Sequence, residues 1–279
     1  NVLEERDVQI RGFPVRLGLD LCMVFSANPE DYTNRGRLVT PLKDRIGSVI
    51  RTHYPLTRQI GIQITDENAW IDREDSVAVV VPRWVREIVE EVSRLARSSP
   101  HVNQQSGVSV RMSIANIENV VSNAERRGVL LGESTTVARI SDLIGLRPSS
   151  RGKLELNMSE ESGEEDALVE RLVQEAVKNV FDQALKPREF RDLIEYFETA
   201  EPLQVGDMIE ADDLLKRFEV IPGFTDRLQA IARRLDPEIS DGDVPVGVQA
   251  STAEFVLEAL HCHNRLNKRS RGDEVRYGL

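Results

Sequence analysis

Four side chains of this 279-residue sequence have types and positions that suit phosphate chemistry. Asn28 ends the apolar run LDLCMVFSAN, Asp44 and Arg45 lie together in LKDRIG, and Arg111 lies in SGVSVRMS. An amide at the end of a buried strand can orient a water molecule or a ligand, because ligands of open α/β sheets bind at the strands' carboxyl ends. A guanidinium group binds phosphate oxygens in a bidentate manner. These residues therefore predict a nucleotide or phosphate site.

Each residue also has an ordinary explanation. Asn-Pro is a common turn dipeptide, and Arg45 beside Asp44 suits a surface ion pair of little energetic value. Ser109 is a good helix N-cap, which places Arg111 in a first turn, where the helix dipole disfavours a cation by roughly 0.3–1 kcal/mol. A bound anion would explain that position, and an exposed arginine whose head group reaches water would explain it too.

The elements expected around these residues begin with an α/β segment, residues 1–56. Apolar residues alternate around Gly12 in VQIRGFPVRL, which predicts a small hairpin. The run LDLCMVFSAN, ending at Asn28, predicts a strand buried on both faces, and IRTHYP, residues 50–55, predicts one further short strand.

A helical period follows from Thr57 onward. WVREIVEEVSRLA and the segment containing Ile114, Ile117, Val121 and Ala124 both place apolar residues on one stripe, so residues 57–147 are expected to form an all-helical unit. RPSSRGKLELNMSEESGEED is expected to be an exposed linker. Further amphipathic segments then predict a second all-α domain within residues 148–279, and a chain that is mostly helical overall.

Composition excludes some functions. The net charge of -11 opposes non-specific binding to nucleic acid or to an anionic membrane. No apolar run approaches the roughly 20 residues of a membrane span, and the two cysteines, Cys22 and Cys262, suit a reducing cytoplasm.

His261, Cys262 and His263 are adjacent on a predicted helix and cannot all face one metal, so no metal site is expected. The basic run HNRLNKRSRG is expected to cap this last helix.

Taken in order, the motifs resemble the second half of an AAA+ ATPase of the MoxR and magnesium-chelatase group. SANPE matches the sensor 1 segment with Asn28, LKDRIG matches the arginine-finger segment with Asp44 and Arg45, and GVSVR matches the sensor 2 segment with Arg111. LEERDVQIRGFPVRL is similar to the hairpin segment that follows Walker B in that group. The resemblance covers about residues 1–130. It implies an α/β remnant of an AAA+ core in residues 1–56 and a helical lid in residues 57–147.

Two motifs of that group are missing from the sequence. A P-loop, GxxxxGK[ST], is absent, and the nearest approach, GLRPSSRGKL, has the wrong spacing and ends in Leu154. A strand ending in the Walker B Asp-Glu is absent as well. The resemblance thus implies that both precede Asn1 in a longer protein, and that this chain alone does not hydrolyse ATP.

In that longer protein, the resemblance implies ATP and Mg²⁺ as cofactors and a hexameric ring as the assembly. Asn28 would position the attacking water, Arg45 would reach the γ-phosphate of the adjacent subunit, and Arg111 would report the nucleotide state to the lid. The resemblance also implies a cytoplasmic, chaperone-like machine with a von Willebrand factor A-type partner protein. Two alternatives stay open: a helical interaction scaffold or adaptor, and an AAA+ transcription activator.

Overall fold

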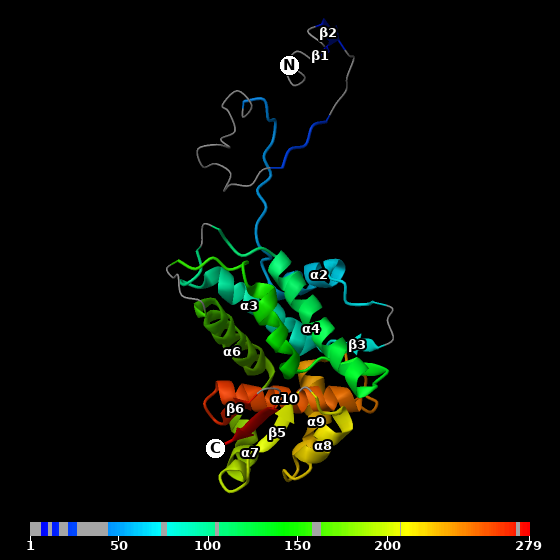
Figure 1. The fold of residues 1–279 in the computed structure, drawn as a ribbon, viewed down its shortest axis with the longest axis vertical. Coiled ribbons are helices and arrows are strands. Elements are labelled where there is room, and N and C mark those ends of the chain that lie inside the picture. Colours follow the sequence, from blue (N-terminus) through cyan, green and yellow to red (C-terminus); the bar gives the residue numbers. More distant parts are fainter. Residues whose placement is uncertain are drawn as a thin grey trace. The chain divides into compact units, whose positions relative to one another are not determined.

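The structure is a computed structural model, and it describes residues 7–10, 13–16, 22–26, 44–73, 77–103, 106–157, 163–206, 208–271 and 274–279. The chain divides into two compact units, Asn1–Tyr54 and Pro55–Leu279. Figure 1 shows the chain with its elements labelled, and each unit is described here by itself.

The first unit contains the expected hairpin, but its described residues do not form the two further strands that were expected. Strands β1 (Asp7–Ile10) and β2 (Phe13–Arg16) pair antiparallel, with Val8 opposite Val15, which confirms the hairpin prediction. Residues 22–26 are exposed and have no regular structure, and residues 50–55 form no strand, so both strand predictions are wrong there. A strand forms only beside a neighbour that pairs its backbone, and in the described part of this unit the ladder is that of β1 and β2 alone.

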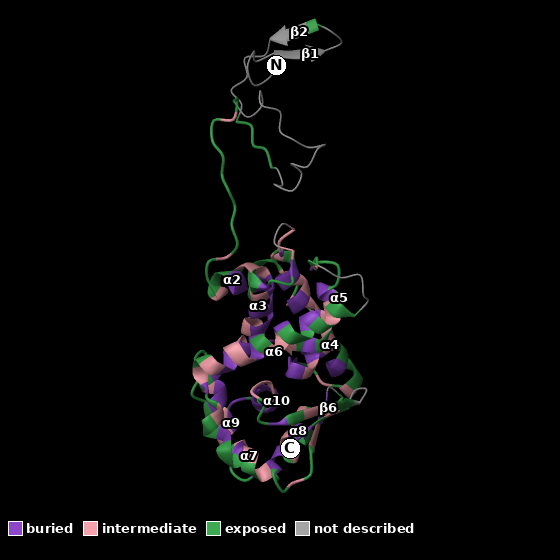
Figure 2. Cartoon of the chain, turned by 90° about the vertical axis from the view of Figure 1, so that its left-hand side faces the viewer, coloured by how far each residue is buried: buried purple, intermediate pink, exposed green. Residues whose placement is uncertain are grey.

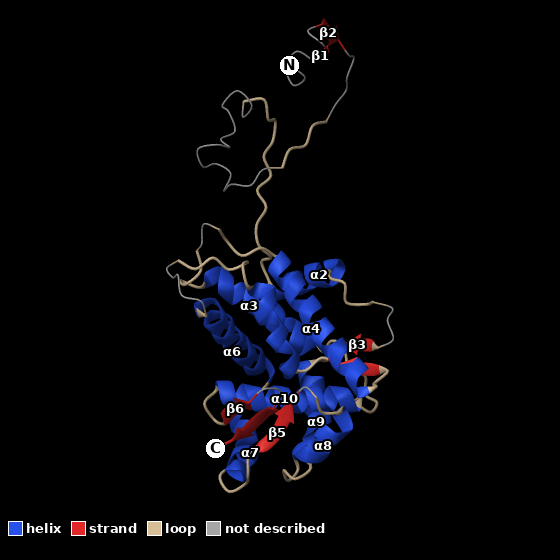
Figure 3. Cartoon of the chain, in the orientation of Figure 1, coloured by secondary structure: helices blue, strands red, loops and turns tan. Residues whose placement is uncertain are grey.

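The second unit is mostly helical, as expected (Figure 3). Its described elements, in chain order, are α2 (Arg58–Asn68), β3 (Ala78–Val80), α3 (Arg83–Ser98), α4 (Arg111–Leu131), β4 (Thr135–Val137), the 3-10 helix η2 (Ile140–Gly145), α5 (Leu146–Ser150), α6 (Glu164–Ala184), the 3-10 helix η3 (Pro187–Phe190), α7 (Arg191–Phe197), β5 (Leu203–Gly206), α8 (Ala211–Phe218), α9 (Phe224–Leu235), α10 (Val246–Cys262), β6 (Asn267–Arg271) and β7 (Glu274–Gly278).

Helix α10 forms the centre of this unit. Its sequence, VGVQASTAEFVLEALHC, is apolar nearly all round, which is typical of a helix buried on every side. In Figure 1, α3, α4 and α6 lie on one side of α10, and α7, α8, α9 and the strands β5 and β6 lie on the other. Helix α10 contacts α6, α8, α9, β4 and η2. Figure 2 shows buried residues on α10 and on parts of α4 and α6.

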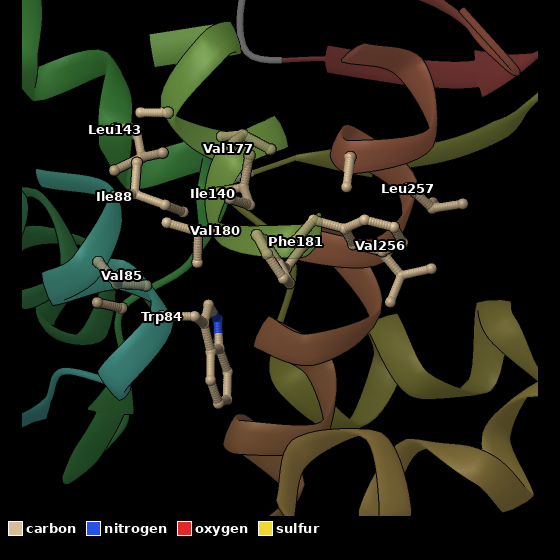
Figure 4. Close-up of a cluster of buried hydrophobic side chains, with 14 of the residues drawn as sticks. Trp84, Val85, Ile88, Ile140, Leu143, Val177, Val180, Phe181, Val256 and Leu257 are labelled. Atoms are coloured by element: carbon tan, nitrogen blue, oxygen red, sulfur yellow. The ribbon is translucent and has the colours of Figure 1, made fainter. Parts of the chain in front are cut away.

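One hydrophobic core runs through the unit, from Val81 to Tyr277. Aromatic rings join its parts: the ring centroids of Trp84 in α3 and Phe255 in α10 lie 6.4 Å apart, and those of Phe181 in α6 and Phe255 lie 6.1 Å apart. Figure 4 shows side chains of α3, α6 and α10 converging in this cluster. The segments expected as lid and as C-terminal domain therefore share one core.

The prediction that residues 57–147 and 148–279 are all-helical is wrong in both segments. Strands β3 and β4 pair in parallel, with Val79 opposite Thr136, and β5, β7 and β6 form an antiparallel sheet in that order. These strands have only 3–5 residues, so they are too short for an alternating pattern to emerge from the sequence.

Two smaller expectations also change. The segment expected as an exposed linker starts as α5, buries Leu154, and pairs Leu156 with Val102 across an antiparallel bridge. The basic run HNRLNKRSRG caps α10 with its first residues, because His263 is the C-cap and the Arg265 N–H group donates to Leu260 O, but it is no tail: its second half is strand β6, a charged strand at the edge of the sheet. None of the described helices combines the length and the apolar character that crossing a membrane requires.

Candidate functional site

The predicted site residues fall in different parts of the chain. Asn28 lies outside the described residues. Asp44 and Arg45 are exposed neighbours in a turn of the Asn1–Tyr54 unit. Arg111 belongs to the Pro55–Leu279 unit, so it is described within that unit. The convergence of Asn28, Arg45 and Arg111 on one ligand thus stays a prediction.

Arg111 is the first residue of α4, and its side chain is exposed. Ser109 lies two residues earlier, and its hydroxyl accepts a hydrogen bond from the Arg111 backbone N–H at 3.2 Å. Ser109 therefore satisfies a free N–H group at the helix start, but the N-cap residue is Val110, so the prediction of Ser109 as N-cap is wrong by one residue, while Arg111 does lie in the first turn. In the part of the chain that the structure describes, no hydrogen bond or ion pair engages the Arg111 guanidinium group.

Buried contacts fix the start of α4. The Ser113 hydroxyl donates to Glu90 Oε2 of α3 at 2.7 Å. Arg97 Nη1 donates to the other oxygen of Glu90 at 3.2 Å, and Arg97 Nε donates to the backbone oxygen of Val108 at 3.2 Å. Met112, the residue after Arg111, is completely buried. The backbone on both sides of Arg111 is thus held, while its side chain projects outward.

The electrostatics of this helix start favour an anion. The first turn of α4 contains no acidic residue, and the unsatisfied N–H groups of a helix N-terminus carry about half a positive charge. The Arg111 guanidinium group adds a full positive charge at the same place. The N–H groups of Arg111 and Met112 are already bonded to Ser109, so the exposed guanidinium group is the donor that could bind a phosphate group here.

A second polar cluster, which the sequence analysis missed, lies inside the unit. Arg127 of α4 and Asp142 of η2 are fully buried, and Arg127 Nη1 lies 2.8 Å from both carboxylate oxygens of Asp142. Asp142 also accepts from Asn123 Nδ2 at 3.0 Å and from the Arg139 backbone N–H at 2.8 Å. The pair therefore joins α4 to η2, and it has enough hydrogen bonds to offset part of its desolvation.

The cluster continues to α10. Arg139 Nη1 lies 3.9 Å from Glu254 Oε1, and both side chains are buried. Burial raises the pKa of the Glu254 carboxyl group, although the nearby Arg139 and Arg127 charges oppose that shift. Burial also lowers the pKa of Arg139, against the attraction of Glu254. The Arg127–Asp142 pair has the chemistry of a structural connection, because both ions are buried and hydrogen-bonded to each other, whereas Glu254 is held less closely by Arg139.

One signal in the sequence could have revealed this cluster. The predicted stripe of α4 runs through Ile117, Val121 and Ala124, and Arg127, three residues after Ala124, lies next to its continuation. An arginine at a core position requires a buried carboxylate partner. Its partner, Asp142, could not be read from the sequence, because it depends on where η2 packs.

His261 and His263, at the end of α10, lie close to oxygen atoms of the protein. Among the described residues, no group of three or more His, Cys, Asp or Glu side chains could hold a metal ion. His261 Nδ1 instead lies 3.0 Å from the Leu266 backbone oxygen, and His263 Nε2 lies 3.3 Å from Asp182 Oδ1.

A function for this chain has to be proposed from its motifs and from the geometry described above, because comparison with known proteins identifies no family. A scan against protein-family models, a search of curated proteins and a search of solved structures each gave no match.

Proposed function

We propose that this chain is the sensor and lid part of a ring-forming AAA+ ATPase similar to the MoxR and magnesium-chelatase group. The observation that carries the proposal is Arg111, exposed at the positive end of a helix whose start is held by buried contacts. This position combines with the order of the Asn28, Arg45 and Arg111 motifs along the chain. The anion that these three motifs together are proposed to bind is a triphosphate.

Each residue has one role in the proposed ATPase. Asn28 positions the attacking water, and Arg45, next to Asp44, stabilises the charge that develops on the γ-phosphate bound to the adjacent subunit. Arg111 binds the phosphates from the lid of the same subunit, so closure of the lid follows the nucleotide state. ATP and Mg²⁺ bind to a P-loop on residues outside this sequence. The assembled ring uses hydrolysis to remodel a partner protein, for which a von Willebrand factor A-type protein is the proposed class.

The first test is the coding sequence upstream of Asn1. The proposal expects a GxxxxGK[ST] motif there, followed by a strand that ends in Asp-Glu. A coding sequence without a P-loop would refute the ATPase and would favour the helical scaffold.

The second test uses Arg45→Ala in the protein that contains both the P-loop and this chain. An arginine finger contributes on the order of 10³-fold or more to turnover, so ATP hydrolysis should fall by that factor while ATP affinity changes little. Arg51→Ala is the matched control, because Arg51 is also exposed in the same unit. If Arg45→Ala keeps more than about a tenth of the turnover, Arg45 is not a finger.

The third test uses Arg111→Ala in the same protein. A charged hydrogen bond to phosphate contributes about 1.5–3 kcal/mol, so ATP affinity should fall on the order of tenfold to a hundredfold. Arg188→Ala is the control, because Arg188 is exposed in η3, far along the chain from α4. Equal ATP affinities in the two variants would remove Arg111 from the site.

A further inference from the structure

A cavity of about 410 Å³ lies among α6, η2, α10 and the β5–β7–β6 sheet. This volume is typical of sites for small organic molecules, which span roughly 300–1,000 Å³. Much of the wall is aliphatic and comes from four different elements: Ile140, Val169, Val173, Val205 and Val275. The apolar part of a ligand would therefore be well accommodated here.

The cations that line the cavity already have carboxylate partners. Arg147 Nη2 lies 3.2 Å from Glu170 Oε2, and this pair is partly exposed. Lys268 Nζ lies 2.8 Å from Glu258 Oε2, which also accepts a hydrogen bond from the Tyr277 hydroxyl group. Two of the three carboxylates that line the cavity are thus neutralised within the wall.

The third carboxylate, Glu254, has an oxygen without a hydrogen-bond partner. The residue is only 2% exposed, and its Oε2 accepts a long hydrogen bond of 3.4 Å from the Ser141 backbone N–H. No described residue donates a hydrogen bond to Glu254 Oε1, because Arg139 Nη1 lies 3.9 Å away and donates to the Ile209 backbone oxygen instead. The Ser141 hydroxyl group, which also lines the cavity, is likewise unpartnered among the described residues.

Unpartnered buried polar atoms are rare in folded proteins, because each loses its hydration without compensation. Here both residues, Glu254 and Ser141, line the same cavity, and each unpartnered oxygen can accept a hydrogen bond from an N–H group. A single water molecule would satisfy them but would occupy only about 30 Å³ of the space. A ligand with a polar head and an apolar body matches both the unpartnered atoms and the aliphatic wall.

We infer that this cavity binds a small organic amine, whose ammonium group donates hydrogen bonds to Glu254 Oε1 and Ser141 Oγ. The apolar body of the amine lies along the aliphatic wall. An ammonium group is favoured over a hydroxyl group because it offers up to three N–H donors to the two unpartnered acceptors, and Arg139 Nη1, at 3.9 Å, donates no hydrogen bond to Glu254 Oε1. Burial raises the pKa of Glu254, and an ammonium group beside it would lower that pKa again.

The test is titration of the chain with primary amines from butylamine to phenethylamine, each compared with the alcohol of the same skeleton. Isothermal titration calorimetry measures both affinities without nucleotide, so the result is independent of the proposed ATPase. We expect at least one amine to bind with a Kd below about 1 mM and about tenfold more tightly than its alcohol. Amines that bind no more tightly than their alcohols, or no binding up to about 10 mM, would overturn the inference.

Two variants assign the binding to this cavity. Glu254→Gln preserves shape and should remove the preference for amine over alcohol, whereas Glu219→Gln, at the exposed end of α8, should leave it unchanged. Val173→Phe fills the cavity from α6, so it should weaken amine and alcohol alike. Circular dichroism confirms that each variant is folded. An amine affinity that is unchanged in both Glu254→Gln and Val173→Phe would place the binding elsewhere.

Discussion

The buried pair of Arg127 and Asp142 should be the most sensitive polar contact of the Pro55–Leu279 unit. Asp142→Asn is the sharpest perturbation, because it removes the negative charge while preserving the size of the side chain. The carboxylate accepts from Arg127 Nη1, from Asn123 Nδ2 and from the Arg139 backbone N–H, at distances of 2.8–3.0 Å. An amide cannot accept all of these bonds, since one of its two heavy atoms is itself a donor.

The magnitude follows from the burial of both partners, which have no exposed side-chain area. Removing one member of a buried ion pair leaves an uncompensated charge and costs about 3–5 kcal/mol of unfolding free energy. For a unit of this size, each kcal/mol lowers the melting temperature by about 2–4 °C. We therefore expect Asp142→Asn to lower the melting temperature by roughly 6–20 °C.

Thermal unfolding followed by circular dichroism measures this shift. The matched control is Asp213→Asn, because Asp213 lies 2.8 Å from Lys216 in an exposed pair on α8, and its loss should leave the melting temperature nearly unchanged. The double variant Arg127→Met with Asp142→Leu removes both charges and should recover part of the lost stability, but not all of it, because the Arg139 N–H group and Val137 O then lose their buried partners. A single variant that melts within about 2 °C of the original protein would show that the pair contributes little, contrary to its geometry.

Three further predictions concern single groups. The pKa of Glu254 is raised above its ordinary 4.5 in the folded chain, so the unfolded chain loses the Glu254 proton at a lower pH than the folded chain does. As pH rises above about 4.5, the melting temperature of the original protein should therefore fall relative to that of Glu254→Gln. Parallel pH profiles of the two melting temperatures would contradict this. Burial raises the pKa of Cys262 to about 12, so little of this thiol is ionised at pH 8. A disulfide reagent such as DTNB should therefore modify the exposed Cys22 at least on the order of 10³-fold faster than Cys262. Rapid reaction of both thiols would show that Cys262 is not buried. Gly128→Ala should lower the free energy of unfolding by about 1–3 kcal/mol, because the new Cβ would lie 2.6 Å from Val77 Cγ1. Urea titration measures this change. A stabilised variant would show that the higher helix propensity of alanine outweighs the clash.

Parts of this fold can be predicted from local sequence patterns, and other parts cannot. The stripes of α3 and α4 and the β1–β2 hairpin are local patterns, so the sequence indicates them correctly. Strand β6, with the sequence NKRSR, has no apolar alternation, and it is a strand because β7 pairs with it. Tertiary context overrides propensity in such short edge strands.

The candidate sites show the same limit. Arg111 is identified by its place in a motif and at a helix start, both of which are local. The cavity at Glu254 combines residues of α10 with residues of η2, α6 and the sheet. Its chemistry depends on which buried oxygen lacks a donor, and that depends on distances between elements remote in sequence.

The order of strands in the β5–β7–β6 sheet has a consequence for biosynthesis. Strand β7 is the middle strand, so β5 has no partner until Glu274–Gly278 has been synthesised, about 70 residues after Leu203. At about 5–20 residues per second, the nascent chain carries an unpaired β5 for roughly 4–14 seconds. During that interval the newly made polypeptide exposes a β-edge to other chains, so a chaperone that holds it on the ribosome would raise the yield of native protein.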